Sequence, residues 1–177
     1  MLLDLVEKRR SIRKFTDEKV SEEDLREILT IALHAPTAKN RNPVRYIVIK
    51  DKKRLEDLSN FKVNSAKFLA GADVAIAIVT DSEIAPNTNH QDASIAATYI
   101  LLAAADLDLG ATWANVTDSK HESGISAQEF LHEFFNLEDK FDVECIIGIG
   151  HPAEEKSEKV PFDYSENVFE DLHDKLK

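Results

Sequence analysis

The stretch from Asp92 to Asp106 constrains the fold more than any other part of this sequence. Its interior consists mostly of Ala, Leu, Ile, Ser, Thr and Tyr, and the 13 residues 93–105 carry no charge. A helix of this composition has no charged face to present to water. We therefore expect a long central helix that is buried on all sides, by its own sheet or by a partner chain. It is shorter than the roughly 20 residues of a membrane span, so no transmembrane segment is expected.

Four further segments are predicted to be strands because they are rich in aliphatic and β-branched residues. They are residues 44–49, 73–79, 110–116 and 143–149. Helices or turns are expected at residues 2–9, 21–34, 53–58 and 62–69, after Ser126, and in the acidic tail after Pro161, which could also form an arm over another subunit. Capping-box patterns begin at Ser21 and at Ser126. Alternation of strands with single helices would by itself favour parallel βαβ units.

Length and charge limit the classes of function. The chain has 177 residues, and we expect one domain that spans residues 1–177. Its formal net charge of −11 repels phosphate backbones and anionic membrane surfaces, so neither nucleic-acid nor membrane binding is expected. Cys145 is the single cysteine, which excludes an internal disulfide and a paired-cysteine metal site. The first residues show no signal-peptide pattern, and a reducing, cytoplasmic location is expected.

A basic cluster lies near the N-terminus. Residues 8–14 (KRRSIRK) hold five of the 22 basic residues, so their local charge opposes that of the whole chain. Arginine side chains and a serine hydroxyl suit a phosphate, because guanidinium groups bind oxyanions through two hydrogen bonds. The other interpretation is a solvated helix end whose cations complement the helix dipole. Neither a G-x-G-x-x-G nor a P-loop motif follows a predicted strand, so phosphate recognition must use side chains.

A second candidate segment is the loop of residues 35–43 (APTAKNRNP), which combines two prolines with two asparagines. Asparagine amides both donate and accept hydrogen bonds, as the pyrimidine edge of a flavin or a ribityl chain requires. The other interpretation is that this loop only ends the preceding helix. We find no motif of paired carboxylates, G-x-S-x-G, H-E-x-x-H or Cys-His type, and therefore predict no catalytic side chain and no metal site.

Taken together, these segments resemble the nitroreductase family of FMN enzymes. The similarity rests on residues 9–15 (RRSIRKF) and on residues 35–43. It continues through the uncharged central helix, residues 109–113 (LGATW) and residues 148–152 (GIGHP), and thus spans nearly the whole chain. The resemblance implies an α+β fold in three layers, in which helices flank a mixed, mainly antiparallel β-sheet around a long buried central helix. It also implies a homodimer with each flavin site at the subunit interface.

The resemblance also assigns cofactor-binding residues. It places Arg9, Arg10, Ser11 and Arg13 on the phosphate and ribityl side of FMN, with Lys159 completing the phosphate site, although Lys156 could take that place. It brings Pro36, Thr37, Ala38 and Asn40 to the isoalloxazine from the second subunit, and pairs Asn64 and Lys67 with the flavin pyrimidine. For these last two residues, an exposed polar face of a short helix is the other interpretation. Trp113 and Ala114 lie where a backbone amide meets flavin N5 in the family.

Three positions depart from the family pattern. Residues 42–44 (NPV) stand where Gln and an aromatic residue are common, and residues 113–115 (WAN) replace a small or glycine-rich step. The second departure leaves the donor to N5 open. His151 stands where tyrosine is more common, and we give it no catalytic role.

The implied activity is that of an FMN-dependent oxidoreductase. Hydride passes from NADH or NADPH to the flavin and then, in a ping-pong cycle, to a nitroaromatic, a quinone or a similar small-molecule acceptor. The cofactor itself stores the electrons, which agrees with the missing acid–base motif. Two alternatives remain at this stage: a flavin-binding or regulatory protein of the same fold without significant turnover, and a phosphate-binding domain that uses no flavin.

Overall fold

The computed structural model describes residues 1–157 and 159–170. Its helices are α1 (Leu2–Lys8), α2 (Glu22–Leu33), α3 (Lys52–Leu58), α4 (Asn89–Asp106), α5 (Ala127–Phe135) and α6 (Tyr164–Asn167), together with the 3-10 helices η1 (Ala38–Asn40) and η2 (Lys67–Gly71). Its strands are β1 (Val44–Ile49), β2 (Val74–Asp81), β3 (Gly110–Asn115) and β4 (Phe141–Gly150). All four predicted strands and the predicted long helices are confirmed. Residues 62–66 precede η2 without forming a helix.

The four strands form one sheet in the order β1-β2-β4-β3, and every neighbouring pair is antiparallel. The parallel units that the alternation of elements alone would favour are therefore absent from this sheet. Beyond β3, Ser11 forms a parallel bridge with Ala111, which makes the assembly mixed. The predicted mixed, mainly antiparallel sheet is confirmed.

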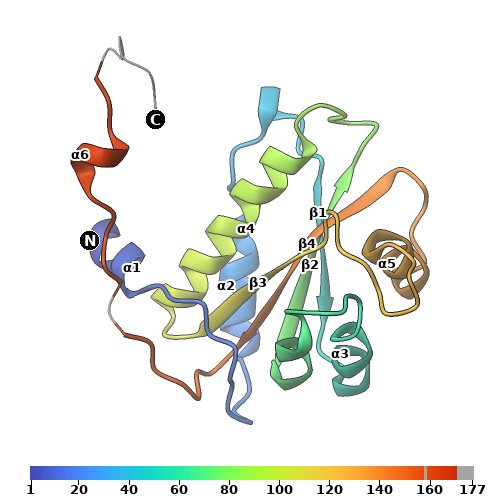
Figure 1. Cartoon of the computed structure of the whole chain (residues 1–177), viewed down its shortest axis with the longest axis horizontal. Coiled ribbons are helices and arrows are strands. Elements are labelled where there is room, and N and C mark those ends of the chain that lie inside the picture. Colours follow the sequence, from blue (N-terminus) through green and yellow to red (C-terminus); the bar gives the residue numbers. More distant parts are fainter. Residues whose placement is uncertain (158, 171–177) are drawn as a thin grey trace.

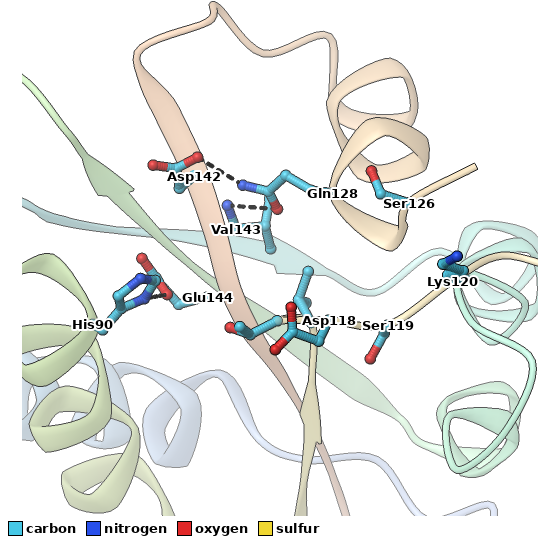
Figure 2. Close-up of a pocket in the computed structure, with 11 residues that line it drawn as sticks. His90, Asp118, Ser119, Lys120, Ser126, Gln128, Asp142, Val143 and Glu144 are labelled. Atoms are coloured by element: carbon cyan, nitrogen blue, oxygen red, sulfur yellow. Dashed lines mark hydrogen bonds and ion pairs between the residues drawn. The ribbon is translucent and has the colours of Figure 1, made fainter. Parts of the chain in front are cut away.

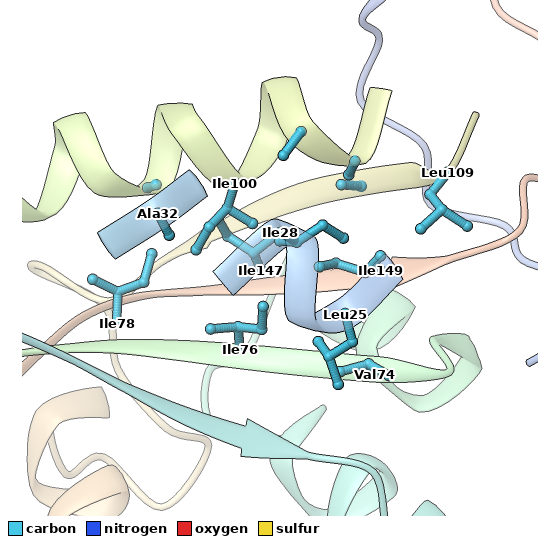
Figure 3. Close-up of a cluster of buried hydrophobic side chains, with 14 of the residues drawn as sticks. Leu25, Ile28, Ala32, Val74, Ile76, Ile78, Ile100, Leu109, Ile147 and Ile149 are labelled. Carbon is cyan, nitrogen blue, oxygen red and sulfur yellow. The ribbon is translucent and has the colours of Figure 1, made fainter. Parts of the chain in front are cut away.

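Helices cover both faces of the sheet (Figure 1). On one face, α2 and α4 pack against the isoleucine-rich sides of β2 and β4, and Ile28 and Ile100 meet Ile76 and Ile147 in the core that Figure 3 shows. On the other face, α3, η2 and α5 bury Leu55, among other residues, against the alternate side chains of the same strands. Two apolar cores separated by one sheet make the predicted three layers.

Serine side chains start two of these helices. The Ser21 hydroxyl oxygen accepts a hydrogen bond from the Asp24 amide at 2.9 Å, and the Ser126 hydroxyl oxygen accepts one from the Glu129 amide at 3.0 Å. Each bond satisfies one of the amide groups that a helix N-terminus leaves without a partner. Both predicted capping serines are confirmed.

Helix α4 is buried along one side and open along another. Its alanines and Ile100 pack on the sheet, whereas an uncharged stripe that includes Ser94, Ile95 and Thr98 is exposed. The hydroxyl groups on this stripe donate back to carbonyl oxygens of their own helix, Ser94 to His90 at 2.7 Å and Thr98 to Ser94 at 2.8 Å. These hydroxyls need no water partner, so the stripe is suited to burial against a second chain.

The two ends of the described chain project from this body. Helix α1 has no buried residue, and α6 lies beyond α4 on the side of the molecule away from α3 and α5 (Figure 1). Large apolar side chains here are exposed, among them Leu2, Leu3, Phe162 and Tyr164. Among the described residues, no helix has the length and apolar character that crossing a membrane requires.

Candidate functional site

The basic segment continues the sheet rather than the helix. Helix α1 ends at Lys8, and from there the chain is extended alongside β3. The Ile12 amide donates to the Ala111 carbonyl at 3.2 Å, and the Thr112 hydroxyl donates to the Ile12 carbonyl at 2.6 Å. The interpretation of this cluster as a helix end therefore applies to Lys8, in the last turn, and not to the residues that follow.

A glycine allows this close approach. A Cβ atom on Gly110 would lie 2.7 Å from Cγ2 of Ile12, well inside van der Waals contact. Ile12 is itself buried, so it cannot simply rotate into solvent. The missing side chain at Gly110 thus lets the basic segment lie flat against the start of β3.

A cleft of about 320 Å³ opens between this segment and the C-terminal end of α4. Its polar lining includes Arg9, Arg10, Glu154 and Lys156. The Nη1 atom of Arg10 is buried and has no hydrogen-bond partner among the described residues. A buried guanidinium nitrogen without an acceptor is costly, and an anion in the cleft would supply the acceptor.

Glu154 organises the wall of the cleft. Its carboxylate accepts the backbone amides of Arg13 at 2.6 Å and Lys14 at 3.2 Å, and it pairs with the Lys156 ammonium at 2.5 Å. The hydrogen bond from Lys156, followed by that from the Arg13 amide, lowers the pKa of Glu154 to about 2. Lys156 therefore lines the cleft with the arginines, whereas Lys159 does not.

Trp113 and Ala114, predicted near flavin N5, lie towards the other end of β3. Trp113 is half-buried, Ala114 is buried and Asn115 is exposed. The Lys62 ammonium donates to the Asn115 carbonyl at 2.9 Å, and burial lowers the pKa of Lys62. From Ala111 to Asn115 the strand rises by about 13 Å. This length separates the end beside Ser11, where the phosphate is predicted (the phosphate end), from the end where the flavin ring is predicted (the ring end).

Neighbours of Asn64 and Lys67 in the chain contact the loop that follows β3. The Val63 amide donates to the Lys120 carbonyl at 3.0 Å, which ties this segment to the loop after β3. Asn64 is exposed in that segment, and Lys67, at the start of η2, bonds to the Asn60 side chain. Because Asn64 precedes η2, the interpretation of the pair as one face of a short helix is wrong for it.

The loop of residues 35–43 lies at the opposite edge of the sheet. It leads into β1, and three strand spacings, about 14 Å, separate β1 from β3. In this chain, then, the loop with Pro36, Thr37 and Asn40 does not meet the cleft beside β3. Its predicted role on the cofactor of a second subunit agrees with this placement and stays a prediction.

Beneath the loop, a cleft of about 250 Å³ lies between α2, β1 and α4. Tyr46 lines it and donates its hydroxyl to the Ala32 carbonyl at 2.9 Å. Burial raises the pKa of Tyr46 to about 12, which keeps the phenol protonated. The bond ties β1 to the C-terminal turn of α2, from which the loop departs.

The loop itself is held in an unusual conformation. Lys39, Asn40 and Asn42 have φ angles of 53°, 55° and 53°, in the left-handed region. Within the loop, the Thr37 hydroxyl oxygen accepts the Asn42 amide at 3.0 Å. Outside it, the carboxylate of Asp92, in the first turn of α4, accepts the Ala38 amide at 2.9 Å.

A polar cavity of about 460 Å³ adjoins the ring end (Figure 2). A register shift opposite Ile78 and Val79 leaves Glu144 as an extra residue in β4. Such a bulge changes the direction of a side chain, and the Glu144 carboxylate, although buried, meets His90 of α4 at 2.5 Å and the Thr80 hydroxyl at 2.8 Å. Across the cavity, the Gln128 amide donates to Asp142 at 2.9 Å.

Sequence reasoning missed several of these groups. Glu144 is a charged residue inside an otherwise apolar segment, and a buried carboxylate in such a place indicates a specific polar partner. Asp92 only borders the uncharged stretch, so its burial carries a weaker signal. Lys62 and Glu154 carry no comparable signal, because each looks like an ordinary surface charge until the fold brings its partner to it. Among the described residues, no cluster of His, Cys, Asp and Glu could hold a metal ion.

The chain matches one family model, described as the nitroreductase family, over residues 6–65 and 54–151. A curated protein of Methanothermobacter thermautotrophicus, provisionally named an NADH dehydrogenase/NAD(P)H nitroreductase, is 33% identical over 164 residues. The match covers 92% of this chain and 83% of that protein.

Solved structures of the same overall shape are also similar in sequence. An FMN-dependent nitroreductase from Clostridium difficile superposes with a TM-score of 0.91 at 38% identity, over 96% of this chain and 99% of that one. A protein from Desulfovibrio desulfuricans, provisionally titled a nitroreductase in complex with FMN, superposes with a TM-score of 0.79 at 31% identity, over 98% of each chain.

Proposed function

The chain belongs to the nitroreductase family, and from that premise we propose that it is an FMN-dependent oxidoreductase. Its electron donor is NADH or NADPH, and its acceptor is a nitroaromatic, a quinone or a similar flat molecule that uses the same site in turn, as a ping-pong cycle requires. The names of the relatives and structural neighbours support the cofactor and the donor.

The observation that carries the proposal is Arg10, which lines the cleft beside β3 and whose buried Nη1 has no hydrogen-bond partner among the described residues. A phosphate placed there would accept hydrogen bonds from Arg10 and be attracted by Arg9 and Lys156. The Ser11 hydroxyl and Arg13 follow on the same extended segment and would hold the phosphate and ribityl side. Because Lys156 lines the cleft, we assign it, before Lys159, to complete this phosphate site.

The ring end supplies the remaining contacts. We assign the N5 contact to the backbone near Trp113 and Ala114, and the pyrimidine contacts to Asn64 and Lys67. When bound, FMN supplies the two-electron chemistry. The Lys67 ammonium would then place a positive charge where negative charge develops on the pyrimidine, and the half-buried Lys62 would reinforce it.

We further propose a homodimer in which each cofactor is shared between the two chains. The uncharged exposed stripe of α4 is the surface that a two-fold partner would cover. Such a partner would carry its own Pro36, Thr37, Ala38 and Asn40 to the groove beside β3, which the loop of the same chain does not reach.

An absorption spectrum of the purified protein tests the proposal. We expect a yellow protein that bleaches with NADH or NADPH and regains its colour with a nitroaromatic or a quinone. Steady-state rates at several fixed acceptor concentrations should give parallel double-reciprocal lines. A protein that takes up no added FMN would refute the proposal, and one that binds FMN but is not reduced by either nicotinamide would instead be the flavin-binding protein without turnover.

A further inference from the structure

We propose that Asp92 is a positioning residue that holds the loop of residues 36–40 in the shape that meets the cofactor of the second subunit. This inference rests on the proposed function and extends it to a residue that is not among those assigned to the cofactor. It follows from the burial of the carboxylate, from its partners and from the backbone of the loop.

The Asp92 carboxylate is buried at the start of α4, and each of its oxygens accepts one hydrogen bond. Asp92 is 2% exposed. One oxygen accepts the Ala38 amide at 2.9 Å, and the other accepts the Thr88 hydroxyl at 3.3 Å. It lies in the first turn of α4, near the positive end of the helix dipole. The bond to Ala38 crosses 54 residues of sequence, so it does more than cap the helix.

The loop needs an anchor because its backbone is strained. Lys39, Asn40 and Asn42 all lie in the left-handed region, which costs about 1 kcal/mol or more for a residue with a side chain. Asparagine tolerates this region, but lysine does so less well. The internal bonds of the loop to Thr37 join it only to itself. Among the side-chain hydrogen bonds of the described residues, the one that Asp92 accepts from the Ala38 amide fixes the backbone of η1 to the core.

This arrangement suits a binding loop. The carboxylate holds the Ala38 amide from below, while Thr37 and Ala38 remain half-exposed and Lys39 and Asn40 exposed above it. In Figure 1 the loop, with η1 in light blue, lies beside the N-terminal end of α4. Loss of the bond would let the strained residues relax and would misplace the groups that face the second subunit.

Two variants remove the bond from opposite sides. Asp92→Ala deletes the acceptor, and Ala38→Pro deletes the donor at the first position of η1, where proline is tolerated after the extended Thr37. In the full-length protein we expect each variant to raise the Kd for FMN roughly tenfold, the effect of losing one charge-assisted hydrogen bond. The double variant should bind FMN no more weakly than either single variant, because the two substitutions remove the same interaction.

Hydrogen exchange gives a second measurement, beside the FMN titration, that does not require the cofactor. In the cofactor-free protein, hydrogen exchange at residues 39–42 should quicken in Asp92→Ala and in Ala38→Pro. Asp92→Asn retains the accepting oxygen and should keep exchange and affinity within about threefold of the original protein. Asp106→Ala, at the exposed end of the same helix, is the control and should change neither quantity.

The outcomes separate this inference from the proposed function. Unchanged exchange or unchanged FMN affinity in both bond-deleting variants overturns the inference, and so does an Asp92→Asn variant as impaired as Asp92→Ala. Should Asp92→Ala fail to fold, Ala38→Pro and Asp92→Asn decide between these results. A parent protein that binds no FMN refutes the proposed function, and quickened exchange would then still support the anchor.

Discussion

The basic segment beside β3 and the loop before β1 are held in place by different means. The segment runs alongside β3, forms a single bridge with Ala111, and has room because residue 110 is a glycine. The loop has non-glycine residues at three positive φ angles and one buried carboxylate beneath it. The first region presents charge on an unstrained backbone, and the second presents amides and hydroxyls on a strained one.

This difference shows how the two half-sites depend on the rest of the molecule. In the proposed site, one chain supplies both the charges of the phosphate end and its pairing with the sheet. The loop lies about 14 Å away across the sheet, so we expect it to act only when a second chain is present.

Dissociation of the proposed dimer should have the largest effect on FMN binding, because it separates the phosphate end of one chain from the loop of the other. Ile95→Glu places a charge on the exposed stripe of α4 without filling the core. Burial of an unpaired charge in the interface is strongly unfavourable, so we expect a monomer by light scattering and no retained FMN. Lys53→Glu, on α3 at the opposite face of the sheet, should remain dimeric. A dimeric Ile95→Glu protein with bound FMN would contradict the shared site.

Removal of the charge at the phosphate end should come next. Arg10→Ala deletes a half-buried side chain whose Nη1 is buried, and loss of one partner of a hydrogen-bonded charge pair costs about 3 kcal/mol, or about 100-fold in the Kd for FMN. Quenching of FMN fluorescence measures it. Lys159→Ala, outside the cleft, should stay within about twofold of the parent protein, whereas an equal loss in both variants would locate the phosphate elsewhere.

The path of the basic segment should be sensitive to a single methyl group. Gly110→Ala forces a Cβ atom against Ile12, and overpacking of this kind costs about 1–3 kcal/mol of unfolding free energy. Gly71→Ala is the matched control, because nothing lies within 4 Å of the added atom. Urea unfolding of both variants compares them, and equal stability would mean that Ile12 yields without cost.

A change to glycine in the loop should raise the unfolding free energy, whereas the change from glycine at position 110 should lower it. Lys39→Gly removes the Cβ atom from a residue at a φ of 53°, and we expect a gain of up to about 1 kcal/mol in unfolding free energy. The gain is partly offset because glycine also has more freedom in the unfolded chain. A loss of stability on the same urea scale would show that the lysine is not strained.

The smallest expected effect is on the pH dependence of the protein's stability. The pKa of Glu154 is about 2 in the folded protein, below its ordinary value of 4.5. A lowered pKa stabilises the fold above the unfolded value, and that contribution is lost as the pH falls from about 4.5 towards 2. Thermal unfolding of Glu154→Gln should therefore depend less steeply on pH in this window. An unchanged slope would show that the bonds to Lys156 and to the Arg13 amide contribute little.

The same contrast explains what the sequence could predict. Periodic apolar residues and capping serines predicted the helices and strands, because local patterns carry those signals. The basic cluster also predicted a phosphate end, and that role stays a prediction. The choice between Lys156 and Lys159 depends on how the chain turns after Pro152, which composition does not encode. The anchor at Asp92 and the bulge at Glu144 were unpredictable in detail, since each depends on a partner more than 50 residues away in the chain.

The unpartnered nitrogen of Arg10 has a consequence for protein turnover. An anion that satisfies this group only in the folded state acts as a folding ligand, and at 100 times its Kd it adds about 2.7 kcal/mol to the free energy of unfolding. A cell poor in flavin would then hold more of this protein in opened forms that proteases cleave. The supply of cofactor would set the abundance of the protein as well as its activity.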